Sequence, residues 1–254
     1  MLEAGSGSAV GVGSAAGPPQ TRQPQGDWIS SALWVGLVLV IGLLLALVVY
    51  AAYEGIFRPQ PPRTAEERQL QVLTKAIADN PKSVAAWTDY ADTLIGLGHL
   101  KAAGDAIAQG LKVAPDSASL VLEKARLEAS QGKTAEALKD ADRVLKIVAD
   151  AQAKQAQENL AKGVTYVPQG GDVVVQALLL KAGVYVGEKQ WPQVVDAASA
   201  ALKEDGTMAD VLIIRAKAYL EEGKKEPARK DAEQALKYAP GYAPAAELLK
   251  NLGK

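Results

Sequence analysis

The amino-acid sequence predicts an all-α protein in which a disordered N-terminal tail and a single transmembrane helix precede a helical solenoid. Three observations lead to this prediction. The first 27 residues are mostly small or polar, an uncharged apolar stretch follows them, and the remainder repeats one pattern every 34 residues. The repeated pattern joins alanine-rich, charged segments by glycine-containing turns, which is typical of consecutive helices.

The N-terminal part of the chain predicts two different states. Residues 1–27 are glycine, serine, alanine, proline and glutamine with almost no large side chains. Because such a segment buries too little apolar surface to offset the entropy of ordering, we expect a disordered tail. The segment Ile29–Tyr53 has no charged residue and, as a helix, is long enough to cross a hydrocarbon core of about 30 Å. With aromatic residues at both ends, it predicts a retained membrane helix over 28–54, a cleaved signal peptide being the alternative.

The charges that flank this segment help to predict on which side of the membrane the rest of the chain lies. One arginine precedes it, whereas Arg58, Arg63 and Arg68 follow it. The positive-inside rule then favours a cytoplasmic C-terminal region, although so small a difference leaves the side open. Residues 55–63 form a proline-rich linker, which we expect to be stiff.

From residue 64 onward the chain consists of units of 34 residues. Small residues at two places let the two helices of a unit approach closely, a glycine opens the turn between them, and a proline ends the second helix. The pattern is clearest in the units that begin at Val84 and Ala209. Equivalent residues in these two units are Trp87 and Leu212, Ala91 and Ala216, Gly98 and Gly223, Ala103 and Ala228, and Pro115 and Pro240.

This pattern resembles the tetratricopeptide repeat family. The resemblance implies units stacked into a right-handed superhelix, with a concave surface lined by the first helix of each unit. The second and third units depart from it, with Ala149 and Gly206 in place of the proline and Lys189 in place of one turn glycine. The expected organisation is a half-repeat over 64–83, repeats over 84–117, 118–151, 175–208 and 209–242, an insert over 152–174 and a C-terminal helix over 243–254.

Charged residues occupy one place in the first helix where the family usually has a buried aliphatic side chain. In two units an aspartate follows sixteen residues later, which predicts ion pairs between Lys124 and Asp140 and between Arg215 and Asp231. A solvated pair contributes about 0–1 kcal/mol, so we expect these pairs to fix helix pairing more than to add stability. Lys181 has an alanine at the equivalent place, and no such pair is predicted there.

The insert combines two kinds of sequence. Its first half is rich in alanine, glutamine, lysine and glutamate, so we expect the preceding helix to continue to about Lys162. The stretch GVTYVPQGG is expected to form a loop. That loop is either a tolerated insertion or a flap that brings Tyr166 and Val167 over the concave groove.

The concave surface implied by the resemblance changes character along the repeats. It is acidic in the first unit, through Asp89 and Asp92, and apolar in the last two. An exposed apolar patch usually marks a binding surface, here suited to a protein or peptide with an apolar face. The alternative is that the insert, or the C-terminal helix through Leu248, Leu249 and Leu252, covers the patch. The candidate partner-binding residues are Leu122, Arg126, Leu179, Leu180, Val186, Ile213, Ile214, Lys217 and Leu220.

The composition argues against several other functions. With 28 basic and 29 acidic residues, the chain has no global field that would attract nucleic acid. It has no cysteine, and its single histidine, His99, falls in a turn between helices. Phosphate-binding glycine loops, nucleophile elbows and metal-ligand spacings are absent from the sequence. We therefore expect no enzyme activity, cofactor, bound metal, nucleic acid or small-molecule substrate.

These expectations describe a membrane-anchored scaffold or assembly factor that binds another protein. Two alternatives stay open. The anchor followed by the NP…AW and VAPD stretches resembles bacterial cytochrome c maturation factors, whose repeat domain holds the apocytochrome. The other alternative is a structural subunit of a larger membrane complex.

Overall fold

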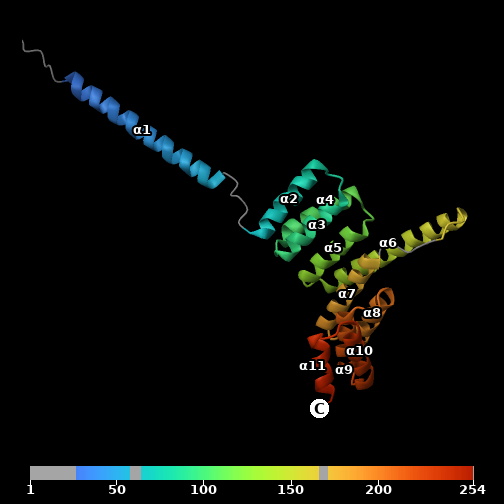
Figure 1. The fold of residues 1–254 in the computed structure, drawn as a ribbon. Helices are drawn as coiled ribbons and strands as arrows, with labels where there is room; N and C mark the ends of the chain where they lie inside the picture. Colours follow the sequence, from blue (N-terminus) through green and yellow to red (C-terminus); the bar gives the residue numbers. More distant parts are fainter. Residues whose placement is uncertain (1–26, 58–63, 166–170, 254) are drawn as a thin grey trace, which may run out of the picture. The chain divides into compact units, whose positions relative to one another are not determined.

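The computed structural model describes residues 27–57, 64–165 and 171–253. Within these ranges the chain forms eleven helices and no strand, in agreement with the expected all-α class (Figure 1). The chain divides into two compact units, Met1–Pro61 and Pro62–Lys254. The helices are α1 (Asp27–Phe57), α2 (Ala65–Asp79), α3 (Val84–Gly96), α4 (Leu100–Val113), α5 (Ala118–Ser130), α6 (Thr134–Ala161), α7 (Gly171–Gly187), α8 (Trp191–Glu204), α9 (Ala209–Glu221), α10 (Lys225–Tyr238) and α11 (Ala243–Leu252).

Helix α1 is the described part of the first unit. Its segment Ala32–Tyr50 carries no charged residue, and every side chain in it is exposed. By length and composition α1 is a candidate membrane span, a property that it shares with signal sequences. The helix contains the predicted span 28–54 and continues to Phe57. The predicted tail and residues 58–63 lie outside the described residues.

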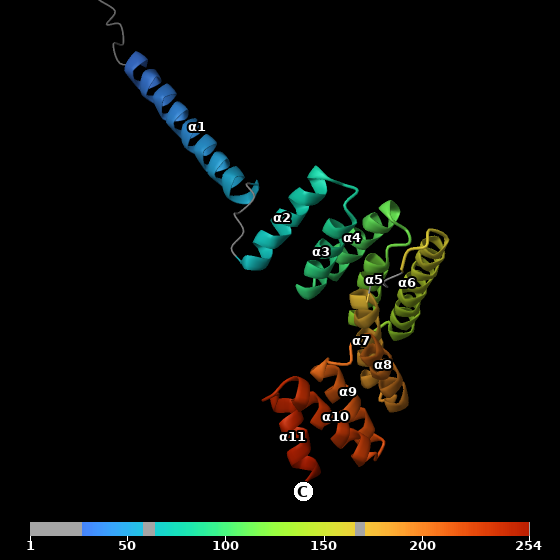
Figure 2. The ribbon, with the colours of Figure 1, turned by 45° about the vertical axis from the view of Figure 1, so that its right-hand side comes forward.

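The second unit is a stack of helix pairs. Helix α3 packs against α4, α5 against α6, α7 against α8, and α9 against α10, and each pair contacts the next. Helix α2 packs against α3 at one end of the stack, and α11 packs against α10 at the other. Figure 2 shows these pairs following one another in chain order. This is the arrangement of a helical solenoid, as the repeat pattern predicts.

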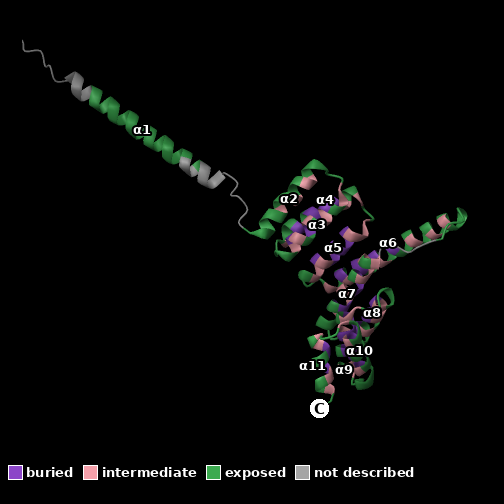
Figure 3. Cartoon of the chain, viewed as in Figure 1, coloured by how far each residue is buried: buried purple, intermediate pink, exposed green. Residues whose placement is uncertain are grey.

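Alanines allow the two helices of a pair to lie close together. In the first repeat Ala91 and Ala103 are fully buried, and in the last repeat so are Ala216 and Ala228. Larger side chains such as Leu212 fill the remaining space. Figure 3 shows the buried residues of this unit gathered along the sides where neighbouring helices meet. The small residues therefore act as the repeat pattern predicts.

The turns inside three of the pairs depend on glycine. Gly98, Gly132 and Gly223 have φ angles of 74°, 74° and 76°, a left-handed conformation that glycine adopts without steric cost. The third repeat keeps this conformation without glycine, because Lys189 has a φ of 57°. A side chain there costs about 1 kcal/mol. The turn geometry is thus preserved in the repeat that departs from the pattern.

The described part of the insert is largely helical. Helix α6 ends with Lys162 as its C-cap, which confirms the predicted extension. Helix α7 begins at Gly171, earlier than the predicted start of the third repeat at Val175. The reason is that valines in its first turn pack against the core clusters of the neighbouring repeats. Tyr166 and Val167 lie outside the described residues, and their role as a flap stays a prediction.

Candidate functional site

The first helices of three successive repeats form a row, because α3 contacts α5 and α5 contacts α7. Helix α9, the first helix of the next repeat, packs against α8. We call the surface that these four helices expose the groove face. Its residues are Asp89 and Asp92 from α3, Arg126 from α5, Gln176, Leu179, Leu180 and Val186 from α7, and Ile214, Lys217 and Leu220 from α9. Glu123 on α5 is buried and pairs with Arg126 of this face.

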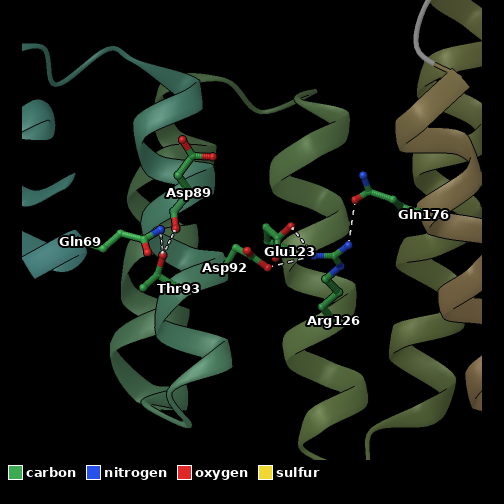
Figure 4. A network of polar contacts seen from close by, with 7 residues as sticks. All are labelled: Gln69, Asp89, Asp92, Thr93, Glu123, Arg126 and Gln176. Atoms are coloured by element: carbon green, nitrogen blue, oxygen red, sulfur yellow. Dashed lines mark hydrogen bonds and ion pairs between the residues drawn. The ribbon is translucent and has the colours of Figure 1, made fainter. Parts of the chain in front are cut away.

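Arg126 connects three first helices (Figure 4). Its Nη1 donates to Oδ1 of Asp92 at 3.0 Å and to Oε1 of Glu123 at 3.3 Å. Its Nη2 donates to Oε1 of Gln176 at 2.8 Å. These partners lie on α3, α5 and α7, which belong to three successive repeats. One guanidinium therefore links side chains of three successive repeats, and it makes this part of the groove face polar.

Glu123 is the buried member of this network. It is 4% exposed, and its Oε2 atom has no hydrogen-bond partner among the described residues. Burial raises the pKa of Glu123 to about 7, Arg126 opposes this rise, and Asp92 and Asp89 add to it. The carboxyl group is therefore partly protonated near neutral pH. A buried ionisable group on a surface of this kind is a mark of a functional site.

Both ion pairs expected within repeats are confirmed. Nε and Nη2 of Arg215 donate to the two carboxylate oxygens of Asp231, each at 2.8 Å. Nη1 of Arg215 also donates to the hydroxyl of Ser199 at 3.0 Å. Lys124 forms an ion pair with Asp140. Both aspartates are buried, so these pairs are less solvated than the sequence implied.

Contacts between repeats were missed by the sequence reasoning. Lys181 pairs with Asp142, which lies on the second helix of the preceding repeat, and not with an aspartate of its own. Arg126 pairs with Asp92, which is separated from it by 34 residues, one full repeat. That spacing is visible in the sequence, so a search for opposite charges one repeat apart finds this pair.

Two of the candidate partner-binding residues are buried, contrary to the exposure that we expected. Leu122 is 2% exposed and packs with Val144 and Ala177 from the neighbouring helices. Ile213 is 3% exposed and packs with Leu248 of α11. Both side chains turn toward the next element of the solenoid, which covers them. The C-terminal helix thus covers part of the patch, as the alternative in the sequence reasoning proposed.

The remaining candidates are accessible to different degrees. Val186 is 42% exposed and Lys217 is exposed. Arg126, Leu179, Leu180, Ile214 and Leu220 are half-buried, and Leu220 packs against the cluster that contains Leu248. Beside Leu220 a hollow of about 260 Å³ opens between α9 and α11. Which of these residues contact a partner stays a prediction.

Two segments of the chain match models of known families. Residues 70–127 and residues 209–242 each match a tetratricopeptide repeat model. A search of curated proteins finds no significant match. Repeats of this family generally mediate contacts between proteins and are generally not catalytic.

Solved structures with the same fold share little sequence with this chain. PilF of Pseudomonas aeruginosa aligns with a TM-score of 0.57 at 16% identity, covering 74% of this chain and 75% of PilF. A thermophilic tetratricopeptide repeat protein of Thermus thermophilus aligns with a TM-score of 0.53 at 16% identity, covering 83% of this chain and 96% of that protein. MamA of Desulfovibrio magneticus aligns with a TM-score of 0.51 at 14% identity, covering 71% of this chain and 89% of MamA. These likenesses concern the fold, and together with the two sequence matches they support the tetratricopeptide repeat family for this solenoid.

Proposed function

We propose that the chain is a membrane-anchored scaffold or assembly factor whose groove face binds a segment of another protein. The observation that carries this proposal is the accessible apolar surface on α7 and α9. Val186 is exposed, and Leu180 and Ile214 are half-buried, with Leu180 packed at the edge of a core cluster. Helix α11 covers Ile213 but leaves these side chains in contact with solvent.

The chemistry of this surface indicates the class of partner. Burial of aliphatic surface contributes about 25 cal/mol per Å², and polar atoms placed against it lose their hydrogen bonds to water. A helix or an extended segment with one apolar face satisfies both conditions. Lys217, exposed on α9, supplies a cation beside this surface. We therefore expect a protein or peptide partner, and not a small molecule.

Helix α1 would hold the solenoid at a membrane. Its uncharged stretch Ala32–Tyr50 supports a single-pass anchor. An anchored solenoid meets partners that are themselves at the membrane, which suits an assembly role. The side of the membrane stays open, with the flanking arginines favouring the cytoplasm.

We expect Val186→Asp to abolish partner capture. A carboxylate placed in an apolar interface loses its hydration without gaining a partner, which weakens binding by at least about tenfold. The measurement is quantitative co-purification of membrane proteins with the full-length chain. Val113→Asp is the matched control, because Val113 is 41% exposed but lies on α4, a second helix. Equal yields of partner from both variants would contradict the proposal.

A further inference from the structure

The polar end of the groove face carries more negative charge than the chain itself neutralises. Asp89 and Asp92 are three residues apart on α3, so they lie on the same side of that helix. Asp92 and Glu123 pair with the guanidinium of Arg126, and Asp89 lies one turn away on α3, where its charge also acts on Glu123 (Figure 4). Both aspartates are exposed, and the carboxylate of Asp89 has no hydrogen-bond or ion-pair partner within the described ranges. The free chain thus presents an unbalanced anionic surface.

A second observation is independent of this count of charges. The Oε2 atom of Glu123 is buried and has no hydrogen-bond donor among the described residues, although the side chain is 4% exposed. An unpaired buried acceptor costs free energy, so a hydrogen-bond donor to this oxygen would stabilise the folded chain. In Figure 4 the Glu123 carboxylate lies between α3 and α5, beside Asp92 and Arg126. A donor that also carries positive charge would pair with this oxygen and would also neutralise part of the excess negative charge.

We propose that Asp89, Asp92 and Glu123 form a subsite for one basic side chain, lysine or arginine, of the segment that binds the groove face. The proposal rests on the function proposed above and adds the chemistry of the ligand. Arg126 binds Oδ1 of Asp92 and Oε1 of Glu123, which orients both groups; Oδ2 of the exposed Asp92 is left for the incoming cation, and the unpaired Oε2 of Glu123 lies buried next to it.

The position of the subsite gives the bound segment a direction. Arg126 also contacts Gln176 on α7, and the half-buried Leu179 and Leu180 follow on that helix. A segment that places its cation between α3 and α5 therefore continues over the apolar surface of α7. The expected partner sequence has one basic residue to one side of a short apolar stretch.

Proton binding at Glu123 is coupled to this interaction. The charges that act on Glu123 are those of Arg126, Asp92 and Asp89, and its pKa of about 7 leaves it partly protonated in the free chain. A cation nearby favours the ionised form and lowers the pKa of Glu123. Affinity for a basic peptide is therefore expected to rise by up to about tenfold from pH 6 to pH 8.

A peptide-display selection on the full-length chain in lipid nanodiscs tests the subsite. Random peptides are selected at pH 8 on the unsubstituted chain, on Asp89→Asn and on Asp105→Asn. Asp89 is exposed and unpaired, so its replacement leaves the fold intact, and Asp105 is an exposed aspartate on α4 that serves as the matched control. Peptides with lysine or arginine at a fixed distance from apolar residues are expected from the unsubstituted chain and from Asp105→Asn. Asp89→Asn is expected to lose the basic preference.

Each other outcome has a definite meaning. Apolar peptides without a basic residue, or a basic preference that survives in Asp89→Asn, overturn the subsite and leave the proposed function standing. If no peptide is enriched by any of the three chains, the proposed function fails and the subsite fails with it. For a selected basic peptide synthesised alone, affinity must rise from pH 6 to pH 8, and Glu123→Gln must remove most of that dependence. A dependence that is unchanged in Glu123→Gln also contradicts the proposal.

Discussion

Replacement of Asp231 by alanine is expected to lower the free energy of unfolding by about 3 kcal/mol. Asp231 is 5% exposed and accepts two hydrogen bonds from Arg215, each at 2.8 Å. The pair lies between α9 and α10, so removal of the carboxylate leaves a largely buried guanidinium without its counter-ion. The hydrogen bond from Arg215 to Ser199 remains, but it does not balance the charge. The measurement is urea denaturation of the full-length chain in detergent micelles, followed by far-ultraviolet circular dichroism.

The pair between Lys146 and Asp150 is the control for this experiment. Both side chains are exposed, at 74% and 67%, so Asp150→Ala is expected to cost less than about 1 kcal/mol. The double replacement Arg215→Met with Asp231→Leu removes both charges together and is expected to recover most of the stability lost in Asp231→Ala. Similar losses of stability in Asp231→Ala and Asp150→Ala would show that burial of the Arg215–Asp231 pair has no energetic consequence.

Glu123→Gln is expected to stabilise the chain at pH 8 by about 3 kcal/mol and to have almost no effect near pH 4. Burial raises the pKa of Glu123 from an ordinary 4.5 to about 7. Between these two values the folded chain binds more protons at this site than the unfolded chain does. The contribution of this site to stability is therefore greatest below pH 4.5 and is lost as the pH rises through 7. Glutamine retains an acceptor for Arg126 and has no charge to bury.

Denaturation curves recorded at pH 4 and at pH 8 measure this effect. Glu233→Gln is the matched control, because Glu233 is exposed on α10 and its replacement is expected to change stability equally little at both pH values. The free energies of unfolding of Glu123→Gln and of the unsubstituted chain are compared at each pH. If their difference is the same at pH 4 and at pH 8, the burial assigned to Glu123 is contradicted. Stability and affinity for a basic peptide should also respond to Glu123→Gln in opposite directions at pH 8, which separates folding from binding.

The repeat spacing predicts contacts within one unit better than contacts between units. The pairs Lys124–Asp140 and Arg215–Asp231 follow from it, because the two helices of a unit cross at fixed places. The burial of Glu123 does not follow, since it depends on how closely α3 and α5 approach each other.

In the apolar part of the candidate site, too, contacts beyond one repeat could not be predicted from the repeat spacing. Ile213 and Ile214 are adjacent, and the repeat register places both of them toward the groove. In the structure α11 buries Ile213 and leaves Ile214 half-exposed, so one residue belongs to the core and its neighbour to the surface. The docking of a C-terminal helix lies beyond the repeat pattern, because it depends on packing after the last complete unit.

Site-specific photo-crosslinking in native membranes tests the proposed function most directly. A photoreactive phenylalanine analogue replaces Val186 on the groove face or, as a matched position, Val113 on α4, where exposure is nearly the same at 42% and 41%. The analogue at position 186 is expected to give a defined adduct with a polypeptide, and the identity of that polypeptide separates an assembly role from the two alternatives. Absence of any adduct from position 186, or the same adducts from both positions, would contradict binding at the groove face.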